Sequence, residues 1–127
     1  MRGIEFRGKI VGAEGFVYGK LLAPLASGNA YIAYDVNEVR SFVYISRSEK
    51  VDPETVGQYT GLKDKNGKKI FEGDICWEEH NECYGVVKFE EGKFLYVWEN
   101  IAEDLWEVAD DIEICGNIHE NPELLEA

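Results

Sequence analysis

The chain has 127 residues, of which 45% are hydrophobic, and its 25 acidic and 13 basic residues give a net charge of −12. This length suits one domain or two small lobes, and the apolar content is enough for a packed interior. The charge argues against direct binding to nucleic acid, which needs a basic footprint, and against binding to anionic lipid.

The first residues and the cysteines favour an intracellular protein. Residues 1–6 lack the apolar run of a signal peptide, and no apolar stretch is long enough to span a bilayer. Three cysteines without a secretion signal favour reduced thiols over a disulfide framework. We therefore expect a cytoplasmic protein that does not bind a membrane.

The N-terminal region, residues 1–57, is predicted to be β-rich. The pattern predicts an edge strand over 2–6 and further strands over 16–22, 31–34 and 41–45, which are rich in β-branched and aromatic residues. Asp52 and Pro53 then predict one helical turn over 53–56, with Asp52 as the N-cap and Pro53 at the first helical position.

The stretch from 58 to 75 holds two predicted tight turns. Asn66-Gly67 is typical of a type I′ turn, whose two central residues both need a positive φ. Asp64 is placed to cap this turn by accepting hydrogen bonds from backbone N–H groups two residues on. Gly73-Asp74 is predicted to turn the chain into the next strand.

The remaining chain is predicted to be a meander of short strands. They are expected over 75–79, 84–89, 94–98 and 112–115, with Glu91-Gly92 as a hairpin turn. Residues 101–108 fit a short helix and a strand equally well, because the pattern is short. Asn121 and Pro122 predict a final helical turn by the same capping logic as Asp52 and Pro53.

Several motifs together carry a resemblance: Val51-Asp52-Pro53-Glu54-Thr55-Val56-Gly57, Gln58-Tyr59-Thr60-Gly61-Leu62-Lys63-Asp64-Lys65-Asn66-Gly67, Ile70-Phe71-Glu72-Gly73-Asp74-Ile75, Gly116-Asn117-Ile118 and Glu120-Asn121-Pro122-Glu123-Leu124-Leu125. In this order they resemble the YopX family of phage and prophage proteins over most of the chain. The resemblance implies a mainly β fold, with an SH3-like small barrel and a C-terminal turn over 58–127. It implies a bacterial host cell and no settled activity, and the family offers no catalytic residues to carry over.

All cysteines and histidines lie in the second half, which raises a metal hypothesis. The candidate ligands are Cys76, His80 and Cys83, spaced C-x3-H-x2-C, with Cys115 and His119. If the chain turns back directly after His80, Cys76 lies roughly 13 Å away along the strand at about 3.3 Å per residue. That distance is too long for a shared zinc ion, so we expect no metal and no cofactor.

The predicted hairpin at Glu91-Gly92 sorts the apolar side chains onto two faces. One face carries the pairs Phe89–Phe94, Val87–Tyr96 and Gly85–Trp98, with Cys76 beside Val87, and is the expected core; Gly85 is expected to leave room for the Trp98 ring. The other face carries Trp77, Val86 and Val97, the candidate binding surface. We expect this face to be covered by the N-terminal half or by a second copy of the chain, because an uncovered apolar patch is costly. A one-residue slip in register would exchange the two faces.

No pattern indicates catalysis. The sequence has no nucleophile motif and no glycine-rich loop that opens a helix to hold phosphate. We therefore expect a non-enzymatic module that binds a host or phage protein, or a second copy of itself. The alternative is an acidic DNA mimic that occupies a host nucleic-acid-binding protein.

Overall fold

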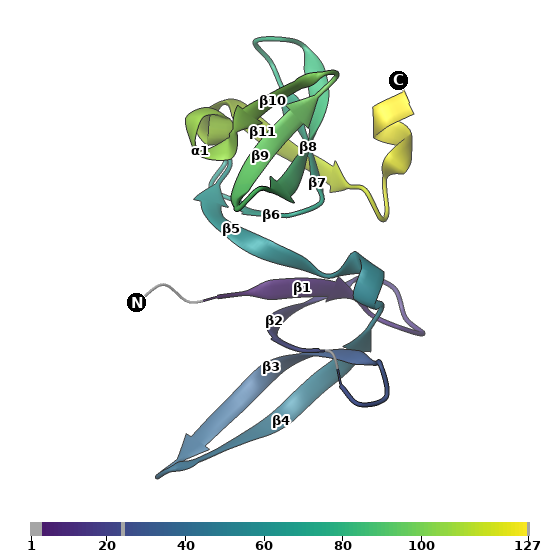
Figure 1. Cartoon of the computed structure of the whole chain (residues 1–127), viewed down its shortest axis with the longest axis vertical. Helices are drawn as coiled ribbons and strands as arrows, with labels where there is room; N and C mark the ends of the chain where they lie inside the picture. The colour runs from purple at the N-terminus through teal and green to yellow at the C-terminus, as the bar shows by residue number, and fades with distance from the viewer. Residues whose placement is uncertain (1–3, 24, 127) are drawn as a thin grey trace. The chain divides into compact units, whose positions relative to one another are not determined.

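The computed structural model describes residues 4–23 and 25–126, and these residues are mainly β, as expected (Figure 1). The chain divides into two compact units, Met1–Gln58 and Tyr59–Ala127. Within the described residues, no helix combines the length and the apolar character needed to cross a membrane.

The first unit is an antiparallel sheet in the order β4-β3-β2-β1-β5. Its elements are β1 (Phe6–Lys9), β2 (Phe16–Leu22), β3 (Ala30–Val39), β4 (Phe42–Val51), the 3-10 turn η1 (Pro53–Thr55) and the start of β5 (Gly57–Lys63). The prediction of an edge strand over 2–6 is wrong in position, since β1 lies between β2 and β5, where Phe6 pairs with Gln58 and Arg7 with Gly57. Residues 2 and 3 of that prediction lie outside the described residues.

The core of the first unit is small. Its buried side chains are Ala30, Ile32 and Val51, and half-buried apolar side chains such as Leu21 and Val56 pack against them. The sheet curls back on itself at its base, where Ile10 bridges Val51 and the Val11 N–H donates to the Lys50 carbonyl at 2.9 Å. The predicted cap of η1 is confirmed, because the Asp52 carboxylate accepts from the Glu54 N–H at 3.0 Å.

The turn that follows β5 differs from the predicted type. Gly67 has φ of 82°, but Asn66 is not among the described residues with positive φ, so the type I′ prediction is wrong. Instead the Gly67 N–H donates to the Asp64 carbonyl at 3.0 Å, which centres the turn on Lys65 and Asn66. The predicted capping by Asp64 is confirmed, since its Oδ1 accepts from the Asn66 N–H at 2.9 Å.

The second unit is built on a five-stranded antiparallel sheet in the order β10-β9-β8-β7-β11. Its elements are β6 (Lys69–Phe71), β7 (Asp74–Glu78), β8 (Cys83–Glu90), β9 (Lys93–Trp98), β10 (Ile101–Asp104), α1 (Leu105–Val108), η2 (Ala109–Asp111), β11 (Ile112–Asn117) and η3 (Pro122–Glu126). The segment 101–108 contains both alternatives, a strand and then one helical turn. Among the described residues the sheet is open, with β10 and β11 as its terminal strands.

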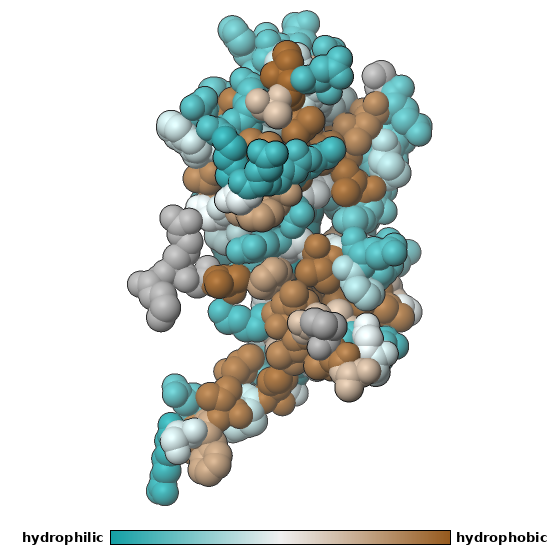
Figure 2. All heavy atoms as spheres, viewed as in Figure 1, coloured by the Kyte–Doolittle hydropathy of each residue, from teal (hydrophilic) through white to brown (hydrophobic). Residues whose placement is uncertain are grey.

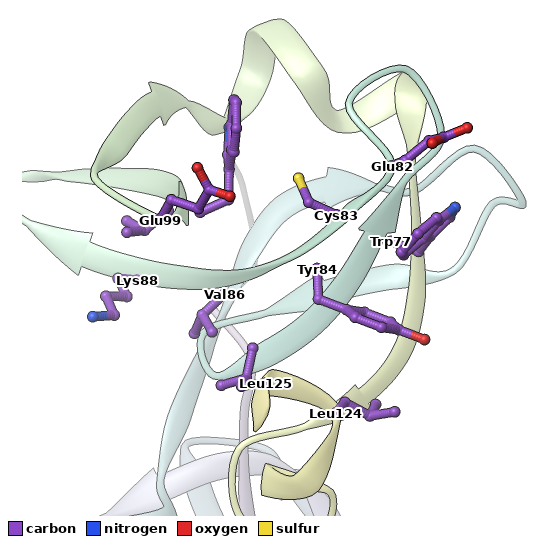
Figure 3. Close-up of a pocket in the computed structure, with 11 residues that line it drawn as sticks. Trp77, Glu82, Cys83, Tyr84, Val86, Lys88, Glu99, Leu124 and Leu125 are labelled. Carbon is purple, nitrogen blue, oxygen red and sulfur yellow. The ribbon is translucent and has the colours of Figure 1, made fainter. Parts of the chain in front are cut away.

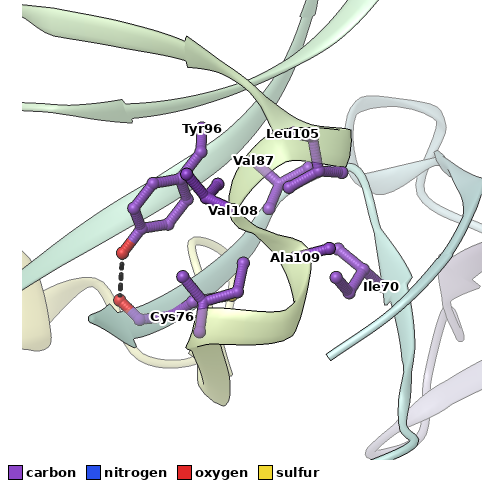
Figure 4. Close-up of a cluster of buried hydrophobic side chains, with 8 residues drawn as sticks. Ile70, Cys76, Val87, Tyr96, Leu105, Val108 and Ala109 are labelled. Atoms are coloured by element: carbon purple, nitrogen blue, oxygen red, sulfur yellow. Dashed lines mark hydrogen bonds between the residues drawn. The ribbon is translucent and has the colours of Figure 1, made fainter. Parts of the chain in front are cut away.

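The predicted register of β8 and β9 is confirmed at Val87–Tyr96 and Phe89–Phe94. The ring that needs Gly85 is that of Tyr96 and not of Trp98, because a Cβ on Gly85 would lie 2.4 Å from Tyr96 Cζ. Tyr96 crosses Gly85 in order to donate its hydroxyl to the Cys76 carbonyl at 3.0 Å (Figure 4).

One buried cluster forms the core of the second unit. The sheet contributes Cys76, Val87, Tyr96 and Ile112, β6 contributes Ile70, and α1 with η2 closes one side. Figure 4 shows Leu105, Val108 and Ala109 of that closing segment directed at the sheet side chains. The face expected to be the core is therefore buried, although Phe89 at its end is half exposed.

Candidate interaction surfaces

The most exposed apolar surface is the hairpin of β3 and β4, residues 34–47, which we call the arm. In Figure 1 it extends away from the other strands of its unit, and Figure 2 shows hydrophobic side chains along it. Phe42 is 73% exposed and Val43 is 66% exposed. The exposed large apolar side chains of the arm are Tyr34, Val36, Val39, Phe42, Val43, Tyr44 and Ile45.

Both faces of the arm are apolar. Paired residues share a face, and pairs alternate between faces along the ladder. The pairs Val39–Phe42 and Asn37–Tyr44 therefore form an aromatic face. By the same register, the pairs Glu38–Val43 and Val36–Ile45 form an aliphatic face. A strand that is apolar on both sides is normally buried on both sides.

The arm also has a free strand edge and a balanced charge. β4 is the terminal strand of its sheet, and its outer side is bonded at the base through Lys50 and Val51. From 42 to 47, the described part of the chain supplies no backbone partner on that side. The arm carries two acidic residues, at 35 and 38, and two basic residues, at 40 and 47, so its net charge is zero in a chain of −12.

The sequence-derived candidates Trp77, Val86 and Val97 line one groove of about 610 Å³ in the second unit. Val86 is buried, whereas Trp77 and Val97 are half-buried. Tyr84 packs its ring edge against Trp77, with centroids 4.9 Å apart (Figure 3).

The C-terminal turn η3 completes the groove. It contributes Leu124 and Leu125, which Figure 3 shows near Tyr84 and Val86. Sequence reasoning did not foresee this contribution, because nothing in a five-residue turn indicates which strand it packs against. The groove is thus partly covered from within its own unit, and its two Trp side chains, Trp77 and Trp98, are half-buried.

Cys83 lies in the same groove but is a poor nucleophile. Burial raises the pKa of its thiol, and the carboxylates of Glu78, Glu99 and Glu103 raise that pKa further. Because the thiolate is the reactive form, the groove favours an unreactive, protonated side chain at this position.

The structure does not bring the five candidate metal ligands together. Cys76 is buried in the core of the second unit, Cys83 is half-buried in the groove, and Cys115 is exposed on β11. His80 is exposed in the β7–β8 loop, and His119 follows β11. Across residues 4–23 and 25–126, no three His, Cys, Asp or Glu side chains are placed to hold a metal ion.

Comparison with known proteins identifies the family. A model of the YopX protein family matches residues 5–126, which is nearly the whole chain. The chain belongs to the YopX family. A solved structure of similar fold is the crystal structure of protein EF1440 from Enterococcus faecalis. It is 23% identical, with a TM-score of 0.69 over 96% of this chain and 97% of that one, so the YopX-family chain shares its fold. No curated protein matches the chain.

The arm was not predicted from the sequence as an exposed surface of this YopX-family chain, although the sequence contains a signal for it. Strands were predicted over 31–34 and 41–45, whereas β3 and β4 each span ten residues. The run from Phe42 to Ile45 is apolar at four successive positions, which predicts a strand in need of cover on both faces. The exposure of these side chains is visible only in three dimensions.

Proposed function

We propose that this YopX-family chain is a phage- or prophage-encoded accessory protein that acts in the cytoplasm of a bacterial host cell as a non-enzymatic protein-interaction module. The observation that carries this proposal is the arm, with seven exposed large apolar side chains on one hairpin. Burying such a side chain contributes about 1.5–3 kcal/mol, so an arm of this composition favours a partner over water.

The groove of Trp77, Val86 and Val97 is proposed as a second contact surface for a protein partner. Its two half-buried tryptophans, Trp77 and Trp98, match the residue type that dominates binding energy at protein interfaces. Glu82, Lys88 and Glu99 supply a charged rim around this apolar floor.

For the fold of the second unit, we propose an SH3-like small barrel. Short antiparallel strands of this unit contribute side chains to one buried cluster, and α1 with η2 covers one side of it. Such a strand arrangement suits a rigid scaffold for binding surfaces.

The experiment compares the host proteins captured by the parent with those captured by two matched variants. Val43→Ser removes an apolar side chain from the arm, and Val11→Ser is its control, since Val11 is 51% exposed and lies outside the arm. We expect Val43→Ser to lose the partner captured by the parent in high salt, while Val11→Ser keeps it. A different outcome would favour the acidic DNA mimic: the parent and both variants capture basic DNA-binding proteins equally, and high salt releases these proteins.

A further inference from the structure

We propose that the arm binds the arm of a second copy of this chain, with one β4 beside the other in an antiparallel pair. The two hairpins then form one four-stranded sheet, β3-β4-β4-β3. This inference rests on the proposed role of the arm as an interaction surface, and it names the partner as the chain itself.

The outer edge of β4 is suited to pairing with another strand. Antiparallel ladders alternate between hydrogen-bonded and non-hydrogen-bonded pairs, and the Arg40-Ser41 loop is flanked by the pair Val39–Phe42. By this alternation, Val43 and Ile45 direct their backbone N–H and C=O groups away from β3. An unpaired row of this kind is satisfied best by another strand, which makes a strand the fitting occupant.

The charge of the arm favours a second copy of the chain as its partner. Each chain carries −12, so most of its surface repels a second copy. The arm has no net charge, because Asp35 and Glu38 balance Arg40 and Arg47. A neutral surface does not attract a basic partner. It also does not repel the neutral arm of a second copy, so two copies can approach each other there.

The composition of the two faces of the arm also suits a symmetric contact. A two-fold axis perpendicular to the joined sheet keeps each face on its own side, so the aromatic face continues into the aromatic face of the second copy. Phe42 and Tyr44 then gain cross-strand neighbours of their own kind, as do Val43 and Ile45 on the aliphatic face. One symmetric contact thus gives apolar side chains on both faces of the arm a lateral apolar neighbour.

The test is the molar mass in solution by light scattering over a dilution series, with two substitutions at one position. Val43→Pro removes an outward N–H without touching the ladder to β3, and Val43→Thr keeps that N–H and the branched shape. We expect twice the 14.4 kDa chain mass for the parent and for Val43→Thr, and the single mass for Val43→Pro. A parent that stays at the single mass, or a Val43→Pro variant that stays at twice it, overturns the proposal.

Hydrogen exchange keeps the proposal falsifiable if Val43→Pro fails to fold. In the parent, the amides of Val43 and Ile45 should exchange more slowly as the protein concentration rises, because the second copy bonds them. Exchange that is independent of concentration overturns β4 pairing. If the parent is a single chain and Val43→Ser still loses its host partner, this inference fails while the proposed function stands.

Discussion

At the scale of single residues, Asp64 joins three backbone donors through one carboxylate. It is 4% exposed, and its Oδ1 accepts from the N–H groups of Asn66 and Lys68, each at 2.9 Å. Its Oδ2 accepts from the Ile114 N–H at 3.0 Å, which ties the turn to β11. Hydrogen bonds to an ionised acceptor are stronger than neutral ones, so this side chain stabilises both the turn and the terminal strand.

Asp64→Ala should therefore destabilise the protein by about 3 kcal/mol, because three backbone donors lose their acceptor. Chemical denaturation measures the free energy of unfolding. Asp110→Ala is the control, since it removes the same charge from an exposed position. Equal stabilities of the two variants would contradict the role given to Asp64.

Gly85 is a second position where one atom decides the packing. In Gly85→Ala the new Cβ would collide with the Tyr96 ring, 2.4 Å from Cζ, and the ring is fixed by its bond to the Cys76 carbonyl. We expect a loss of about 1–3 kcal/mol from overpacking. The control Lys88→Ala, on the exposed part of the same strand, should change thermal stability far less. A Gly85→Ala variant as stable as the parent would show that the Tyr96 ring moves to make room for the new Cβ.

Tyr96 also predicts a pH dependence. Burial raises the pKa of its phenol, while the unfolded chain has a pKa of about 10. The stability that comes from the neutral buried phenol is fully present below about pH 10 and is lost as the pH rises toward the folded-state pKa. Tyr96→Phe should start less stable but lose less stability above pH ~10 than the parent does. Denaturant titrations measure the free energy of unfolding at each pH. If the parent and Tyr96→Phe lose stability equally above pH ~10, the buried phenol is not the cause.

At the scale of elements, the β8–β9 hairpin contains a strained turn. Glu91 has φ of 50° and Gly92 has φ of 82°, so both central residues are left-handed, as in a type I′ turn. Asn tolerates this conformation better than Glu, and Glu91→Asn should stabilise the protein by about 0.5–1 kcal/mol. The control Glu90→Asn, one residue earlier in the strand, should not raise the melting temperature. If the two variants raise the melting temperature equally, the gain comes from the removed charge and not from the turn.

The register of the β8–β9 hairpin could be predicted from the sequence because its signals are local. Glu91-Gly92 and the alternation of Val87 and Phe89 fix the β8–β9 pairing. The β7–β8 turn assumed directly after His80 is wrong, since Cys83 pairs with Glu78. The Asn66-Gly67 turn could not be predicted in type, since the Asp64 carboxylate draws the neighbouring N–H groups into a different turn.

The candidate surfaces depended on contacts far apart in sequence. Trp77, Val86 and Val97 were assigned to one face from strand periodicity, and they do line one groove. The contribution of Leu124 and Leu125 to that groove was not predicted, because periodicity does not indicate which strand a terminal turn packs against. The exposure of the arm was hidden for the same reason, since an apolar run predicts burial and does not say what buries it.

At the scale of the whole molecule, the net charge of −12 sets how association should respond to salt. Salt screens the repulsion between two copies and leaves apolar contact intact. The dimer proposed through the arm should therefore strengthen with added sodium chloride, as measured by sedimentation equilibrium. Capture of a basic partner by the acidic surface should weaken under the same conditions. A dimer that dissociates in salt would mean that charged groups hold it.

The pairing of β1 with β5 has a consequence for synthesis on the ribosome. Phe6 and Arg7 leave the ribosome early, yet their partners Gln58 and Gly57 emerge only after the whole β3–β4 hairpin has been made. Local hairpins form quickly, whereas this closing contact must wait for the later residues. The open edge of β4 is thus formed before the contact between β1 and β5 completes its unit.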